Sequence, residues 1–179
     1  MITLITGGAR SGKSRYALQI PEPDERSECK PDRAQPSSVE SYTYIATAEL
    51  LDDEMRERAE RHRNERGTRW RTIEEPIEVG PRLVELKGIV VVDCLTMWLS
   101  NWVFRDETQV EAQIHFLCAA LRDATCHVRL ITNEVGSSIV PENPLGRRFR
   151  DWAGIMNERV AGVSDAVYLM VAGIPLRIK

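Results

Sequence analysis

The stretch with the clearest chemical content lies near the N-terminus and reads GGARSGKS, residues 7–14. Its glycines, lysine and serine match the pattern G-x-x-x-x-G-K-[ST]. Glycine lets the backbone adopt positive φ and approach a phosphate closely, and successive N–H groups then form a concave anion site. The lysine ammonium neutralises phosphate oxygens, and the serine hydroxyl can bind Mg²⁺. We expect the whole of this phosphate loop to bind a nucleoside triphosphate: Gly7, Gly8, Ala9, Arg10, Ser11, Gly12, Lys13 and Ser14.

A second candidate is Asp93, which ends the apolar run IVVVD. An acid at the end of a neighbouring hydrophobic strand organises the metal beside many phosphate loops. An aspartate that caps the following helix is the alternative. We favour the metal role and predict Ser14 and Asp93 as the Mg²⁺ ligands. This arrangement predicts nucleotide binding without saying what is done with the phosphate.

A third candidate is His62, in a segment where residues 56–71 hold seven arginines and three glutamates. His62 continues the stripe of Leu51, Met55 and Ala59 and is therefore expected to face the body of the protein. A neutral imidazole can attack phosphorus, and nearby guanidinium groups would stabilise the transferring group. Spacing alone favours a structural histidine over a nucleophile.

A further polar stretch, TNEVGSSIVPEN, occupies residues 132–143. Its first part follows a predicted strand, where open α/β sheets place ligand loops, and its end opens a long helix. Loop and helix-cap chemistry is one interpretation, and a pocket for a polar second substrate is the other. The residues concerned are Asn133, Glu134, Gly136, Pro141, Glu142 and Asn143.

The elements that position these residues follow from hydrophobic periodicity. Short apolar runs predict strands at residues 2–6, 42–47, 70–73, 89–93, 128–132, 166–171 and 175–178, with 89–93 at the centre of the sheet. Helices are expected at about residues 13–20, 52–64, 78–86, 110–121 and 149–163. Residues 21–41 hold four prolines and predict an irregular loop insert. The order predicts a single domain, residues 1–179, of the α/β class: a RecA-like P-loop NTPase whose largely parallel central sheet is flanked by helices and ends in a C-terminal strand pair.

Composition narrows the function classes. The chain has 179 residues and a net charge of −3, so no overall basic field indicates a nucleic-acid partner. Its four cysteines show no C-x-x-C spacing, which favours reduced thiols. The N-terminus has no signal-peptide pattern, and the longest apolar run, residues 89–99, is too short to span a bilayer. We therefore expect a cytoplasmic protein.

Several stretches together resemble the bifunctional adenosylcobinamide kinase/adenosylcobinamide-phosphate guanylyltransferase family of cobalamin biosynthesis. They are TGGARSGKSRYA, YIATAELLDDEMRERAERHR, WRTIEEP, LITNEVGSSIVPENPLGRRFRD and NERVA, in this order over nearly the whole chain. The resemblance implies two reactions. A nucleoside triphosphate, ATP or GTP, phosphorylates the aminopropanol hydroxyl of adenosylcobinamide. GTP then gives its GMP unit to adenosylcobinamide-phosphate through a GMP–histidine intermediate, forming adenosylcobinamide-GDP.

The resemblance also assigns residues. His62 matches the guanylylated histidine, which reverses the preference for a structural role. The remaining nucleotide-binding expectations are a turn at Ala46, Thr47 and Ala48, the residues Arg63, Asn64, Glu65 and Arg66, the acid Glu74 near the guanosine, and Asp93. Many relatives carry another histidine where this chain has Arg61. A homotrimer is implied as well. A plain P-loop small-molecule kinase without guanylyl transfer is the alternative.

Overall fold

A computed structural model of the chain describes residues 1–19, 41–49, 57, 60, 63, 66–137 and 139–179. The predicted insert 21–41 lies outside these residues except for its last position. Most of the predicted helix 52–64 lies outside them too, although residues 57, 60, 63 and 66 are helical. Of the predicted site residues, His62, Asn64 and Glu65 are not among those described.

Seven strands form one sheet in the order β3-β2-β4-β5-β1-β6-β7. Their bounds are β1 Ile2–Gly7, β2 Tyr42–Ala46, β3 Arg71–Glu74, β4 Ile89–Asp93, β5 His127–Ile131, β6 Ala166–Val171 and β7 Ile174–Arg177. All neighbouring strands run parallel except β6 and β7, which are antiparallel. The α/β sheet and the C-terminal strand pair confirm the predicted fold class.

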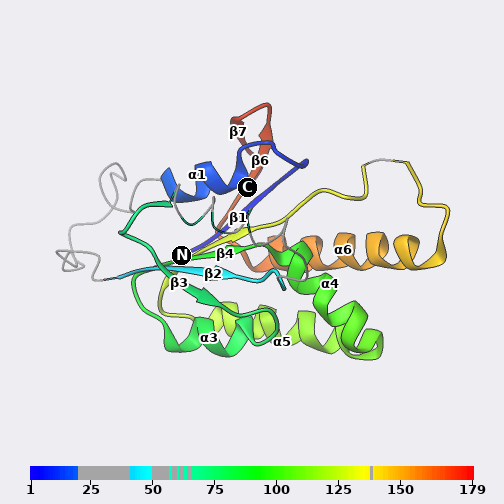
Figure 1. Cartoon of the computed structure of the whole chain (residues 1–179), viewed down its shortest axis with the longest axis horizontal. Helices are drawn as coiled ribbons and strands as arrows, with labels where there is room; N and C mark the ends of the chain where they lie inside the picture. The colour runs from blue at the N-terminus through cyan, green and yellow to red at the C-terminus, as the bar shows by residue number, and fades with distance from the viewer. Residues whose placement is uncertain (20–40, 50–56, 58–59, 61–62, 64–65, 138) are drawn as a thin grey trace.

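Helices cover both faces of the sheet, as the sequence predicts (Figure 1). They are α1 Lys13–Gln19, α3 Val79–Glu85, α4 Leu95–Asp106, α5 Val110–Asp123 and α6 Pro144–Val163, with a short 3₁₀ turn at Glu107–Gln109. On β1, Leu4 packs into the layer of α3 to α6, whereas its neighbour Ile5 packs into the layer of α1. This alternation follows from the two-residue period of a strand.

Strand β4 is the apolar run IVVVD, and it is buried on both faces of the sheet as such a run predicts. Residues 89–92 are fully buried because side chains on both faces meet helices. The run was expected at the centre of the sheet. It lies one strand away, because β5 occupies the middle and separates β4 from β1.

Helix α4 is an element that the sequence analysis does not predict. Only Cys94 separates it from β4, so strand and helix share one apolar run in which the boundary is hidden. Its buried residues do show helical spacing: Leu95, Trp98, Leu99, Trp102 and Val103. Within the described ranges no helix is long and apolar enough to cross a membrane.

Candidate nucleotide site

The phosphate loop joins the end of β1 to the start of α1, as its motif requires. Gly7 and Gly12 have φ values of +144° and +92°. A Cβ on Gly7 would lie 2.6 Å from the carbonyl oxygen of Met170 in β6. No side chain is tolerated at that distance, so glycine is needed at position 7 for close packing as well as for its backbone conformation.

Lys13 places its charge inside the loop. Its Nζ donates hydrogen bonds to the carbonyl oxygens of Gly7 at 3.0 Å and Gly8 at 2.6 Å. Burial lowers the pKa of Lys13, while the nearby Cys94 and Asp93 oppose this shift. Ser11 Oγ is buried with no hydrogen-bond partner among the described residues. A phosphate oxygen would satisfy that hydroxyl, so the loop is suited to an anion.

Ser14 and Asp93, the two predicted metal ligands, are in contact. Ser14 Oγ donates to Asp93 Oδ2 at 2.9 Å. The expectation of a neighbouring strand was wrong, because β4 carries Asp93 and β5 lies between it and β1. The contact forms because α1 crosses back over β5 toward β4. The two ligands therefore meet although their strands do not pair.

Tyr44 is a site residue that the sequence analysis missed. Its hydroxyl donates to the same Asp93 oxygen that accepts from Ser14. The ring is 3% exposed, and the Arg66 guanidinium lies over it at 3.7 Å from the centroid. Burial raises the pKa of Tyr44, with a further increase from the Asp93 carboxylate, so the hydroxyl keeps its proton and acts as a donor. Only the alternation of the YTYIA strand could have indicated an inward-facing tyrosine.

Three predicted site residues lie side by side at the carboxyl ends of neighbouring strands β3, β2 and β4. Ala46 on β2 lies opposite Glu74 on one side and Asp93 on the other. Neighbouring strands are about 4.8 Å apart, so the Glu74 and Asp93 backbones are separated by about 10 Å. Glu74 Oε1 accepts from Arg63 Nη2 at 2.7 Å, and both side chains are more than half exposed. Such an exposed pair contributes little stability, so either partner can be given up to a ligand.

The turn after β2 has a structural task in addition to the predicted one. Thr47 is fully buried, and its hydroxyl donates to the Cys94 carbonyl and accepts from the Cys94 N–H, both at 2.8 Å. Its own N–H donates to the Asp93 carbonyl at 3.1 Å. Asn101 on α4 donates to the Thr47 carbonyl at 2.7 Å. These bonds occupy the Thr47 side chain and fix the backbone beside Asp93.

The segment 132–143 is held by side-chain hydrogen bonds at both ends. At its start, Asn133 Nδ2 donates to Thr96 Oγ1 at 2.8 Å. At its end, Asn143 caps α6 by accepting from the Gly146 N–H at 2.6 Å. The cap confirms the structural interpretation for Asn143. Arg147 on α6 donates to the Pro141 and Glu142 carbonyls, which ties this end of the segment to the helix.

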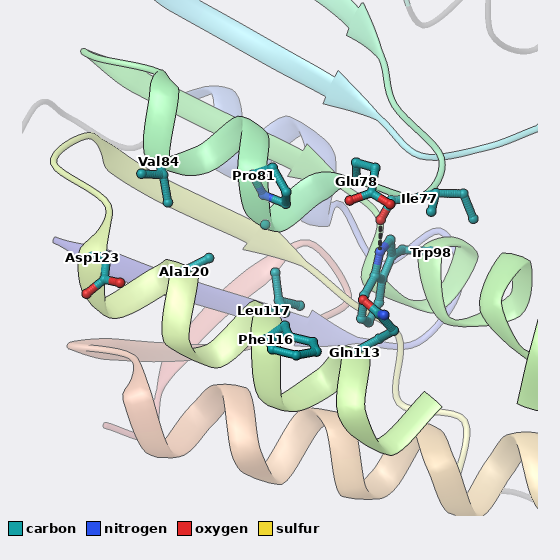
Figure 2. A pocket seen from close by; sticks show the side chains of 11 residues that line it. Ile77, Glu78, Pro81, Val84, Trp98, Gln113, Phe116, Leu117, Ala120 and Asp123 are labelled. Carbon is teal, nitrogen blue, oxygen red and sulfur yellow. Dashed lines mark hydrogen bonds between the residues drawn. The ribbon is translucent and has the colours of Figure 1, made fainter. Parts of the chain in front are cut away.

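Two hollows on the described surface differ in whether predicted site residues line them. The larger, about 400 Å³, lies between α3 and α5 and is closed at one end by Trp98, whose indole donates to the Ile77 carbonyl at 2.8 Å (Figure 2). No predicted site residue lines it. The smaller, about 330 Å³, lies beside the phosphate loop and is lined by Arg10, Ser11, Gly12, Arg15, Ala172 and Gly173. The predicted phosphate loop therefore borders the smaller hollow and not the larger one.

The residues present fit a Mg²⁺ ion that is held partly by the protein and partly by the nucleotide. Among the described residues no group of three histidine, cysteine or acidic side chains could hold a metal. Mg²⁺ in nucleotide enzymes is bound by one or two protein oxygens together with phosphates and water, and Ser14 and Asp93 supply such oxygens.

The three described cysteines are free and buried, and burial raises the pKa of each: Cys94, Cys118 and Cys126.

The sequence of this chain is similar to those of bifunctional proteins of adenosylcobalamin biosynthesis. Residues 3–178 match the family described as cobinamide kinase / cobinamide phosphate guanyltransferase. The bifunctional adenosylcobalamin biosynthesis protein CobU of Escherichia coli is 36% identical over 196 residues, and that of Salmonella typhimurium is 35% identical over the same length, with 100% of each chain covered. The CobP protein of Pseudomonas aeruginosa is 36% identical over 183 residues, covering 100% of this chain and 98% of the relative.

Among solved structures, a KaiC-like protein from Pyrococcus horikoshii OT3 has a TM-score of 0.46 and 12% identity, covering 94% of this chain and 69% of that one. The chain belongs to the cobinamide kinase / cobinamide phosphate guanyltransferase family.

Proposed function

We propose that this chain phosphorylates adenosylcobinamide and then transfers GMP from GTP to the phosphate through a covalent intermediate on His62. The two activities, cobinamide kinase and cobinamide phosphate guanylyltransferase, are those of the family to which the chain belongs. The observation that carries the proposal is the contact of Ser14 with Asp93 beside Lys13, because these groups bind a triphosphate and its metal.

The phosphate loop supports the kinase reaction. Lys13 is positioned to neutralise charge on the phosphates as the terminal phosphoryl group is transferred, and Ser11 offers an additional donor. When bound, Mg²⁺ would neutralise phosphate charge, and Ser14 and Asp93 would hold it. Tyr44 keeps Asp93 oriented by donating to its Oδ2 oxygen.

The distribution of histidines supports His62 as the nucleophile. The chain has three histidines. His127 starts β5 opposite Ile89, and the site lies at the other end of these strands, about 13 Å away along four residues. His115 is exposed on α5. His62 directly precedes Arg63, which contacts Glu74 at the carboxyl edge of the sheet, so we assign Arg63, Arg66 and Glu74 to the guanylyl site.

The test is the intact mass of the protein after incubation with GTP and Mg²⁺. The expected result is one added GMP, lost in acid and retained in base as a phosphoramidate is. His62→Ala should abolish the adduct, and the matched control His115→Ala should keep it. If His62→Ala is labelled as fully as the wild type, the intermediate lies elsewhere.

The same experiment separates the second candidate. A plain kinase would phosphorylate cobinamide, form no adduct and release no pyrophosphate from GTP. We further propose that the enzyme works in the cytoplasm, where its nucleotide substrates are found, and that it assembles as a homotrimer. Sedimentation of the purified protein tests the assembly.

A further inference from the structure

Glu134 is attached to the phosphate loop, although it lies far from it in sequence. Its backbone N–H donates to the Gly7 carbonyl at 3.2 Å. The same carbonyl accepts from Lys13 Nζ at 3.0 Å. Glu134 and the Lys13 ammonium therefore meet at one oxygen at the start of the loop.

The Glu134 carboxylate is held on one side and open on the other. Oε1 accepts from the hydroxyl of Thr6, a buried residue of β1, at 2.6 Å and from Asn157 Nδ2 at 3.3 Å. Across the described ranges no donor contacts Oε2. The residue as a whole is exposed. One oxygen is thus fixed in place while the other faces solvent.

Asn157 on α6 fixes the direction of this segment. Its amide accepts from Thr132 Oγ1 at 2.7 Å and donates to the Asn133 carbonyl at 3.2 Å. The TNE and NERVA stretches therefore meet in space. These contacts hold the two residues before Glu134, and its own N–H is bonded to Gly7, so its carboxylate is presented from a fixed support.

We propose that Glu134 is the general base of the kinase reaction, an inference that rests on the proposed function. Strand β5 lies between β4, which carries Asp93, and β1, which leads into the phosphate loop. The segment after β5 therefore emerges between the predicted metal ligand and the triphosphate cradle. A hydroxyl that attacks the terminal phosphate there has the open Oε2 as a proton acceptor.

The hydroxyl oxygen of cobinamide forms a bond to the terminal phosphorus, and the bond from that phosphorus to the bridging oxygen breaks. The nucleoside diphosphate leaves, and the hydroxyl proton passes to Glu134. The two acids predicted at this edge of the sheet already accept hydrogen bonds: Asp93 from Ser14 and Tyr44, and Glu74 from Arg63.

The guanylyl transfer makes no such demand. Its nucleophiles are an imidazole and then a phosphate oxygen of cobinamide phosphate, and the ionised phosphate carries no proton to remove. A base at Glu134 is thus required in one reaction and dispensable in the other. A purely structural role would affect both reactions alike.

The experiment measures the two reactions separately, with cobinamide for the kinase and cobinamide phosphate for the transfer. Glu134→Gln retains an oxygen that can accept from Thr6, and its unfolding midpoint confirms the fold. We expect kinase kcat to fall by about 10²- to 10⁴-fold and transfer kcat to be unchanged. Glu158→Gln, an exposed residue of α6, is the matched control and should leave both reactions unchanged.

A second variant distinguishes a base from a support. In Glu134→Ala, added formate should restore kinase turnover, and it should not accelerate the wild type. Full kinase activity in Glu134→Gln, or an equal loss of both reactions, overturns the assignment. A wild type that forms neither product refutes the proposed function itself, which is a separate outcome.

Discussion

Replacing Tyr44 with phenylalanine isolates one hydrogen bond of the nucleotide site. The change removes a hydroxyl and leaves the ring, so Arg66 can still lie over it as it does at 3.7 Å. Asp93 loses one of the two donors on its Oδ2 oxygen and keeps Ser14. The fold is otherwise untouched, so the difference in unfolding free energy reports this bond.

The expected magnitude follows from burial and charge. A hydrogen bond to a charged group contributes about 1.5–3 kcal/mol, more than a neutral one. The Tyr44 ring is 3% exposed, so water does not replace the lost donor. We expect Tyr44→Phe to lower the unfolding free energy by about 2 kcal/mol at pH 7.

The pH dependence provides a second signature. Folding raises the pKa of Tyr44 above its unfolded value, which is about 10. Above that pH the unfolded chain releases the proton and the folded chain keeps it. The stabilisation is therefore complete below about pH 10 and declines as the pH rises further. Tyr44→Phe lacks this titration, so the two proteins should converge in alkaline solution.

Urea unfolding at pH 7 and at alkaline pH measures both effects. Tyr42→Phe gives the cost of removing a hydroxyl at the other end of the same strand, where Tyr42 lies beneath Arg69 at 3.6 Å and pairs with Ile89. A double-mutant cycle with Asp93→Asn should give a coupling energy of about 1 kcal/mol or more. A Tyr44→Phe protein within about 0.5 kcal/mol of the wild type would refute the reasoning.

Three further predictions concern the loop and the acid stability of the sheet. Gly7→Ala should lower the unfolding free energy by about 1–3 kcal/mol in urea titrations. Gly8→Ala should fold as the wild type does, because no atom of the described residues lies within 4 Å of its new Cβ. Lys13→Met should reduce kcat/KM of the kinase assay by about 10²- to 10³-fold, and unchanged kinetics would remove Lys13 from the site. Burial lowers the pKa of His127, and the charges of the N-terminus and Arg129 lower it further. As the pH falls, the unfolded chain therefore binds a proton before the folded chain does. The free energy of unfolding should decrease below about pH 6.5, the ordinary pKa of histidine. His127→Gln should flatten that loss in melting temperatures measured from pH 7.5 to 5.5, and an equally steep loss would assign it to other groups.

Local signals predicted those parts of the site that lie close together in sequence. The phosphate loop needs a strand, a glycine-rich turn and a helix within residues 2–19, and each is visible in the letters. Asp93 was found in the same way, from an apolar run that ends in an acid. In both cases the spacing along the chain determines the geometry.

The missed features depend on pairing between distant segments. Tyr44 reaches Asp93 only because β2 and β4 are neighbours in a particular register, which no short stretch specifies. Asn157 reaches Glu134 from helix α6, and this contact between a helix and the segment after β5 has no signal in either stretch alone. Helix α4 was hidden for the opposite reason, since its apolar residues continue those of β4.

The residues proposed for the two reactions lie at different strands along one edge of the sheet. Asp93 contacts the phosphate loop through Ser14 and the helical residue Arg66 through Tyr44. Asp93 ends β4. Glu74 ends β3, two strands away on one side, and the phosphate loop follows β1, two strands away on the other side. A substitution at Asp93 should therefore impair both reactions, one at Glu74 mainly the guanylyl transfer, and one at Glu134 the kinase alone. That graded sensitivity follows from position across the sheet, and a common loss at all three positions would mean that both reactions share one set of groups.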